Sequence, residues 1–272
     1  MYPMSIIKFV GSVASNWDLL ITLAKRDVLG RYRGSVLGVF WSFINPLTML
    51  LLYTFMFSVI FKARWGVQAE TVTTKSEFAI IIFAGLLVFN FFSEVISKSP
   101  TLIIANSNYV KKVIFPLEIL SLAAVLSALF HLLISFIVWL IFYSVILGAP
   151  PITVLLFPIA MLPAVFFSLG LSWILASTGV YIRDIGQIIG TILTAMMFLS
   201  PVFYPLSAIP NEFQYLFKIN PMTDIMEIVR GVLYWGFFDE STFFVALIVT
   251  LIFCWLGYTW FQATRRGFAD VI

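Results

Sequence analysis

Long uncharged apolar stretches are the feature that most limits what this chain can fold into. The first runs from residue 37 to residue 61 without a single Asp, Glu, Lys or Arg. About 20 helical residues, roughly 30 Å at 1.5 Å each, cross the hydrocarbon core of a bilayer. Hydrophobic residues make up 61% of the 272-residue chain and charged residues only 11%, too few to cover a water-soluble core. The sequence therefore predicts an all-α polytopic membrane protein and excludes a soluble enzyme, a nucleic-acid-binding module and a disordered chain.

Six such stretches predict six transmembrane helices within one transmembrane domain, residues 37–272, preceded by an N-terminal cytoplasmic segment, residues 1–36. The predicted spans cover residues 37–61, 78–97, 117–147, 152–180, 185–203 and 243–261. Six spans place both termini on one side of the membrane. Eleven of the 16 Lys and Arg residues fall in segments on that side. The positive-inside rule therefore predicts that both termini lie in the cytoplasm.

Residues 17–33 precede the first span and predict an amphipathic helix at the membrane surface. Apolar residues recur there at helical spacing, and Lys25 and Arg26 lie on the opposite arc. Asp27 falls on the apolar side, where Arg31 four residues later is its expected partner. Two interpretations stay open, a generic membrane anchor and a collar beside a translocation path.

Residues 98–116 connect the second and third spans and contain helix signals that a short loop does not need. Ser99 followed by Pro100 predicts the start of a helix. A small helix lying across the membrane face could dock into a cytoplasmic partner. The alternative is a plain positive-inside anchor that uses Lys111 and Lys112.

Residues 204–241 are apolar but are interrupted by several prolines. Asn220 followed by Pro221 predicts the N-cap and first position of a helix. Irregular backbone at membrane depth is tolerated only where protein or a water-filled path shields it. Two short helices on the outer face therefore fit this segment better than a seventh span.

Polar and aromatic residues recur together in two of the predicted spans. The candidate lining residues of a path through the membrane are Asn45, Thr48, Tyr53 and Phe55 in the first span and Gln187, Thr191, Thr194 and Phe198 in the fifth. A sugar suits such a route, because its C–H face stacks on an aromatic ring while its hydroxyls exchange hydrogen bonds with amides and hydroxyls. Contact between helices is the alternative reading of the same pattern.

Patterns for catalysis, cofactors and metals are missing from the sequence. None of the eight lysines follows a glycine, so there is no Walker A motif, and one Cys with one His makes no metal cluster. We therefore expect a chain without catalytic, cofactor or metal residues. His131 lies near the middle of the third span with no partner at depth evident, which favours a packing role over a proton relay. Small residues of the fourth span, from Ser168 to Gly179, likewise predict close helix packing.

Five blocks of sequence resemble the permease subunits of ABC-2-type exporters for bacterial surface polysaccharides. In chain order they are LAKRDVLGRYRGSVLGVFWSFINPLTMLLLYTFMFSVIF, NSNYVKKVIFPLEIL, STGVYIRDIGQI, SPVFYPLSAIP and KINPMTDIMEIVRG. They are distributed over nearly the whole chain, from residue 23 to residue 231. Permeases for O-antigen polysaccharide export are the most similar group, and those for teichoic acid and capsule come next.

This resemblance implies partners, a substrate and roles for particular residues. The partners would be a second copy of the chain and two ATPase subunits, which use ATP and Mg, and the substrate a lipid-linked polysaccharide at the bacterial inner membrane. ATPase coupling would fall to Asn106, Asn108, Tyr109, Lys111 and Lys112, and the cytoplasmic entrance to Arg26, Asp27, Arg31, Arg33, Arg183 and Asp184. The periplasmic gate would comprise Pro201, Phe203, Tyr204, Pro205, Met222 and Met226. Residues 17–33 match the interface helix of that family.

Two other classes of protein are compatible with a polytopic chain. An ion-coupled secondary transporter would need an ion site at depth and a repeat of broken helices. A membrane enzyme acting on lipid-linked sugars would need converging acidic or histidine residues. Neither pattern is found in the sequence.

Overall fold

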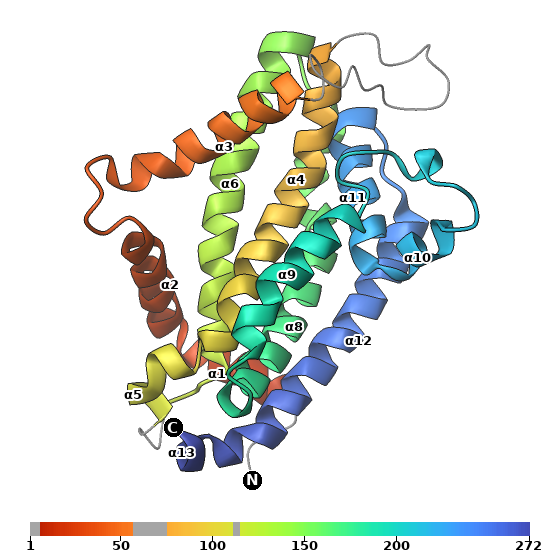
Figure 1. Ribbon diagram of the computed structural model, residues 1–272. Coiled ribbons are helices and arrows are strands. Elements are labelled where there is room, and N and C mark those ends of the chain that lie inside the picture. Colours follow the sequence, from red (N-terminus) through yellow and green to blue (C-terminus); the bar gives the residue numbers. More distant parts are fainter. Residues whose placement is uncertain (1–5, 57–74, 111–114) are drawn as a thin grey trace.

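The computed structural model describes residues 6–56, 75–110 and 115–272, and the described residues form helices and the turns between them (Figure 1). The longer helices are α1 (Ile6–Ser15), α2 (Trp17–Arg31), α3 (Trp41–Tyr53), α4 (Lys75–Lys98), α6 (Ile119–Leu147), α8 (Leu162–Tyr181), α9 (Ile185–Phe198), α11 (Pro221–Arg230) and α12 (Glu240–Thr264). Short helices and turns are η1 (Gly38–Phe40), η3 (Ser99–Thr101), η4 (Ile104–Asn106), α5 (Ser107–Val110), η5 (Ile152–Leu156), α7 (Phe157–Ala160), η6 (Leu206–Ala208), α10 (Gln214–Ile219), η7 (Gly231–Trp235), η8 (Arg265–Gly267) and α13 (Phe268–Val271). Because α1, α5 and α13 lie at one end of the bundle, we call that end the base.

Within the described parts of the chain, five segments are long and apolar enough to cross a membrane, which confirms a polytopic helical architecture. They are Gly38–Met56, Ser76–Thr101, Ile119–Leu147, Ile152–Tyr181 and Glu240–Val271. The fifth predicted span, 185–203, is shorter than expected. Its helix α9 has 14 residues, about 21 Å at 1.5 Å per residue. The chain turns after Phe198, where Pro201 has no N–H to continue a helix and the Tyr204 hydroxyl donates to the Phe198 carbonyl.

Helix α4 forms the core of the bundle and packs against α6, α8, α9 and α11. Its residues from Phe78 to Phe89 are all buried. The indole of Trp139 on α6 donates a hydrogen bond to the Ile80 carbonyl at 3.0 Å. Apolar residues all round a helix are expected when other helices surround it.

Small residues hold α8 close to its neighbours. A Cβ added at Gly257 of α12 would lie 2.2 Å from the Gly170 carbonyl oxygen, so the backbones are in direct contact. Ser168, Ser172, Ala176 and Gly179 are buried, which confirms the predicted packing role of this ladder. The predicted fourth span is divided into η5, α7 and α8, with Pro158 and Pro163 in the first turns of α7 and α8.

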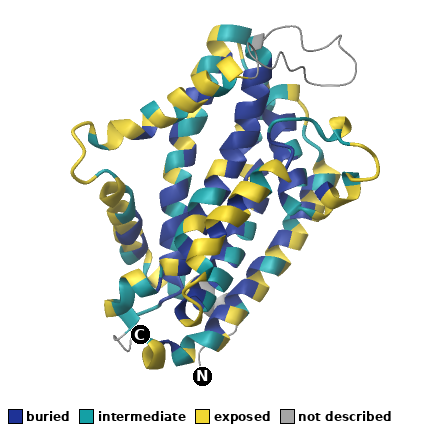
Figure 2. Cartoon of the chain, in the orientation of Figure 1, coloured by how far each residue is buried: buried dark blue, intermediate teal, exposed yellow. Residues whose placement is uncertain are grey.

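Helices α3 and α9 are covered least by the rest of the chain. Figure 2 shows both mostly in the colour of exposed residues, in contrast to the buried α4. Only Ser42 and Leu50 of α3, and only Ile189 and Leu193 of α9, are buried. Two apolar helices therefore present large faces to the surroundings of a single subunit.

Candidate functional site

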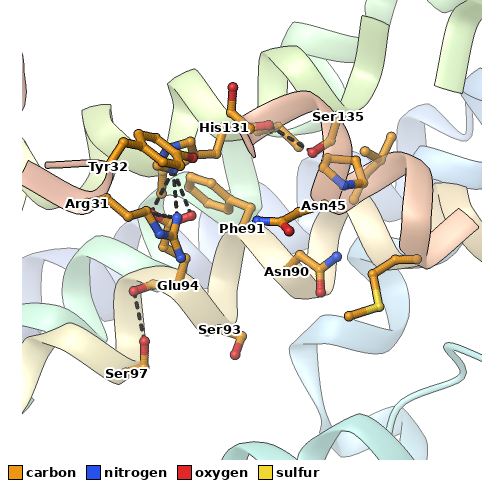
Figure 3. A pocket seen from close by; sticks show the side chains of 16 residues that line it. Arg31, Tyr32, Asn45, Asn90, Phe91, Ser93, Glu94, Ser97, His131 and Ser135 are labelled. Carbon is orange, nitrogen blue, oxygen red and sulfur yellow. Dashed lines mark hydrogen bonds and ion pairs between the residues drawn. The ribbon is translucent and has the colours of Figure 1, made fainter. Parts of the chain in front are cut away.

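A cavity of about 310 Å³ opens between α3, α4 and α6 beside the end of α2. Figure 3 shows its polar side chains, which come from elements far apart in the sequence. The polar residues that form the candidate site are Arg31, Asn45, Asn90, Glu94, His131 and Ser135. On α4 the lining residues run from Leu87 to Ser97, in the half of the helix that ends at the base.

Glu94 is the centre of an ion-paired cluster in this cavity. Its Oε1 lies 2.9 Å from Arg31 Nη1 and 3.2 Å from Lys98 Nζ, and its side chain is 10% exposed. His131 Nδ1 lies 2.8 and 3.0 Å from the two carboxylate oxygens. Arg31 Nη1 lies 3.0 Å from the same nitrogen. A protonated Nδ1 would donate to the carboxylate, whereas an unprotonated Nδ1 would accept from Arg31. The sequence suggested no partner for His131 at depth, and the structure supplies Glu94 from the neighbouring helix.

Lys98 joins the cluster to the amphipathic helix α2 a second time. Its Nζ lies 2.8 Å from Asp27 Oδ2. The predicted pairing of Asp27 with Arg31 is therefore wrong. Each residue reaches past its own helix to a charged side chain of α4, while α2 itself packs against α6.

Arg26 connects α2 to the segment predicted to couple to a partner. Its guanidinium donates to the Tyr109 hydroxyl at 3.1 Å and to Asn106 Oδ1 at 2.9 Å. The ring of Tyr109 stacks on Phe115 with ring centroids 4.3 Å apart. Asn108 is exposed. One predicted entrance residue and two predicted coupling residues are thus in direct contact.

The remaining predicted base residues do not join these clusters. Lys111 and Lys112 lie outside the described residues. Arg33, Arg183 and Asp184 are exposed, and the ion pairs found among the described residues involve none of them.

The coupling segment is attached to the bundle at its start and just after its end. Ser99 Oγ lies 2.8 Å from Ser172 Oγ, and a Cβ added at Gly179 would lie 2.0 Å from the Pro100 carbonyl oxygen. At the other end, Glu118 Oε2 lies 2.7 Å from Arg265 Nη1. A displacement of this segment must therefore move α8 and the end of α12 with it.

The side chains predicted to line a path are exposed on α3 and α9. This holds for Asn45, Thr48, Phe55, Gln187, Thr191, Thr194 and Phe198, while Tyr53 is half-buried. Of these residues, Asn45 faces the cavity between α3, α4 and α6 within one subunit. Their assignment to a channel stays a prediction.

An aromatic cluster forms at the end of the bundle opposite the base. Phe203 lies with its ring centroid 5.6 Å from that of Tyr53 and 6.2 Å from that of Phe198. Tyr204 lies edge-on to Phe217 of α10, with centroids 6.2 Å apart. Residues predicted separately as channel lining and as gate are therefore brought together at the ends of α3 and α9.

Helix α11 beneath this cluster begins as predicted. Asn220 Oδ1 accepts from the Met222 amide at 3.1 Å, which confirms the N-cap, and the Asn220 amide nitrogen donates to Ser200 Oγ at 2.9 Å. Met222 and Met226 are fully buried, as is Pro201, while Pro205 is half-buried. The predicted gate residues thus divide into an aromatic surface and a packed support.

Arg230 fixes α11 to the core and was not predicted as a site residue. Its fully buried guanidinium donates to the Val202 carbonyl at 2.8 Å and to Glu227 Oε1 at 2.9 Å. A Cβ added at Gly85 of α4 would lie 2.4 Å from Arg230 Nη2. The lone glycine in an otherwise bulky apolar span is the signal that marks this close approach.

Sequence reasoning also missed a polar stripe on α4. Asn90, Ser93, Glu94 and Ser97 recur at helical spacing and lie along one side. Asn90 and Ser97 are exposed, although the rest of α4 is almost entirely buried. The spacing itself was the available signal, hidden by the length of the apolar run around it.

The fold and the cavity define a class: a polytopic helical membrane protein whose polar groups gather along one side of its central helix. Residues 18–234 match the model of the ABC-2 type transporter family. The chain belongs to that family.

Individual relatives extend the similarity over almost the whole chain. The O-antigen export system permease protein RfbA of Myxococcus xanthus is 30% identical over 98% of this chain and 100% of its own length. The protein of the same name from Klebsiella pneumoniae is 24% identical over 98% and 99%. The polysialic acid transport protein KpsM of Escherichia coli is 22% identical over 89% and 92%.

Proposed function

We propose that this chain is the permease subunit of an ATP-driven exporter that moves a lipid-linked O-antigen-type polysaccharide across the bacterial inner membrane. The observation that carries the proposal is the end-to-end similarity to an O-antigen export permease, at 30% identity over 98% of the chain. Polysialic acid transport is the named role of a more distant relative, at 22% identity. Capsule export is therefore the second candidate within the same family.

The energy for transport comes from a partner. The sequence has no Walker A motif, and a permease of this family works with a separate ATPase. Two copies of that subunit, using ATP and Mg, bind the base of a permease dimer, which places both termini in the cytoplasm. The chain itself is a transport subunit and carries no catalytic residue.

A second copy of the chain completes the path. The exposed faces of α3 and α9 carry polar and aromatic side chains, which suits neither lipid nor water alone. Pairing two subunits across these faces encloses a channel between them, and α9 provides the sixth crossing despite its length. A polymer longer than the membrane is thick cannot be enclosed by an alternating-access cavity, which favours a continuous channel.

Coupling runs through contacts at the base. The segment with Asn106 and Tyr109 meets the ATPase and transmits its movement to α2 through Arg26. At the opposite end, Phe203 and Tyr204 close the path until the chain of sugars pushes them aside. The supporting α11 and its Met side chains hold this gate in place.

A deletion of the gene with plasmid complementation tests the proposal. We expect loss of surface polysaccharide and accumulation of lipid-linked polymer inside the cell, both reversed by the intact gene. Sugar analysis of the accumulated polymer separates O-antigen from capsule. Surface polysaccharide that is unchanged by the deletion contradicts the proposal. If export continues after the partner ATPase is inactivated but stops when the proton gradient collapses, the chain is an ion-coupled transporter instead.

A further inference from the structure

We propose that the cavity between α3, α4 and α6 is a binding site for a neutral sugar unit of the transported polymer, an inference that rests on the proposed function. The cavity measures about 310 Å³, room for a single sugar ring with its water. The polar stripe of α4 provides a third wall of the path, because α4 packs against both α3 and α9.

Unused hydrogen-bonding groups point into this space. Figure 3 shows Asn45 of α3 and Asn90 of α4 facing the same cavity. Among the described residues neither amide has a hydrogen-bond partner, and Nε2 of His131 is buried without one. An amide offers two donors and two acceptor lone pairs, which matches the paired donor and acceptor character of sugar hydroxyls.

The fixed charges of the cavity favour a neutral ligand over a phosphate. Arg31 and Lys98 are already paired with Glu94 and Asp27, so the four charges balance. A diphosphate would have to compete with Glu94 for Arg31, and the carboxylate would repel it. A sugar hydroxyl can instead donate to Glu94 without breaking the ion pair.

The depth of the cavity supports a role in transport. Glu94 lies seven residues before Thr101 at the base end of the span, about 10 Å along the helix. Exposed polar side chains at that depth are costly in lipid and persist where water or a polar cargo reaches them. A sugar leaving the cytoplasmic headgroup region would meet this site first.

Photo-crosslinking in cells tests the location. A photoreactive benzoylphenylalanine is placed at position 90, at position 191 on α9, and at position 141, where Ile141 is 58% exposed on α6. We expect an adduct with polysaccharide, detected by antibody to the glycan, from position 90 and none from position 141. An adduct from position 191 without one from position 90 overturns the site while the proposed path stands. If neither position 90 nor position 191 gives an adduct, the proposed site is also wrong. The deletion phenotype tests the proposed function separately.

Binding measurements test the chemistry. The complex of the full-length permease with its ATPase, in nanodiscs, is titrated with the strain's own polysaccharide freed of lipid and diphosphate by mild acid. Asn90→Leu and Asn45→Ala are expected to weaken binding about tenfold each, because each removes one hydrogen bond or more from the ligand. Phe43→Ala, which alters the α6-facing side of α3, is expected to leave binding unchanged. The proposed site is wrong if inorganic pyrophosphate competes with the polysaccharide for binding. It is also wrong if all three variants bind the polysaccharide with the affinity of the wild type.

Discussion

Arg31 Nη1 lies 2.9 Å from Glu94 Oε1, and this ion pair joins the end of α2 to the central helix α4. The Glu94 side chain is 10% exposed and the Arg31 side chain 47%, so the carboxylate is shielded from solvent while the guanidinium is half-exposed. Lys98 Nζ and His131 Nδ1 lie 3.2 and 2.8 Å from the same carboxylate oxygen. Helix α2 is therefore held to the bundle by charge as well as by its buried residues Leu20, Leu23 and Ala24.

Loss of the Glu94 carboxylate should loosen α2. In Glu94→Ala, the partly buried Arg31 and His131 lose their common acceptor, and we expect a destabilisation of about 1–3 kcal/mol. The thermal unfolding midpoint of the purified protein measures it. A double-mutant cycle with Arg31→Met gives the pairwise energy, and additive effects of the two changes would contradict a direct interaction.

The contact between Arg26 and Tyr109 should matter for coupling and little for folding. Tyr109→Phe removes the hydroxyl that accepts from Arg26 and leaves the stacking on Phe115 intact. We expect normal amounts of the complex, normal ATP turnover by the ATPase alone, and a several-fold lower export rate per ATP hydrolysed. The exposed Ala105 gives a matched control, since Ala105→Ser changes the same segment at a residue with no assigned role in coupling. Equal export by wild type and Tyr109→Phe would remove the contact between Arg26 and Tyr109 from the coupling route.

The fold class and most helix bounds could be predicted from the sequence, because a helix that crosses lipid must be a long stretch of consecutive apolar residues. The N-cap at Asn220, the apolar runs and the small-residue ladder of α8 depend on residues close in sequence. The C-terminal end of α9 could not be predicted in this way. The turn at Pro201 and the hydrogen bond from Tyr204 cut the helix short inside a run that stays apolar to Phe203.

The candidate site was predictable only where its residues are neighbours on one helix. Stripes on α3 and α9 could be found from spacing. Glu94 and His131 come from different helices, 37 positions apart, so their contact depends on how α4 and α6 are rotated against each other. The choice of Lys98 over Arg31 as the partner of Asp27 has the same cause.

The N-cap of α12 should respond to pH. Hydrogen bonds from Ser241 and Thr242 hold the pKa of Asp239 below its ordinary value of 3.8. A lowered pKa in the folded state means that the cap stabilises above the unfolded value and that this contribution is lost as the pH falls through the folded value. Hydrogen exchange at the Thr242 amide should therefore accelerate below about pH 4 relative to unstructured amides. In Asp239→Asn, which keeps an acceptor but no charge, that acceleration should disappear.

The packing of Gly85 against Arg230 provides the sharpest test of the outer segment. A methyl group at position 85 would lie 2.4 Å from Arg230 Nη2, so Gly85→Ala must displace a guanidinium that donates to the Val202 carbonyl beside the aromatic cluster. Displacement leaves a buried charge with fewer partners, and we expect a loss of about 2–4 kcal/mol in stability.

The matched control is Gly190→Ala in the middle of α9, where an added Cβ meets nothing within 4 Å. There the higher helix propensity of alanine should stabilise by up to about 1 kcal/mol. Thermal unfolding midpoints should thus move in opposite directions for two identical substitutions. Because Val202 precedes Phe203, Gly85→Ala should also raise the protease or label accessibility of the turn at residues 199–204, whereas Gly190→Ala should not. A Gly85→Ala protein with wild-type stability and an inaccessible turn would show that Arg230 does not hold this segment.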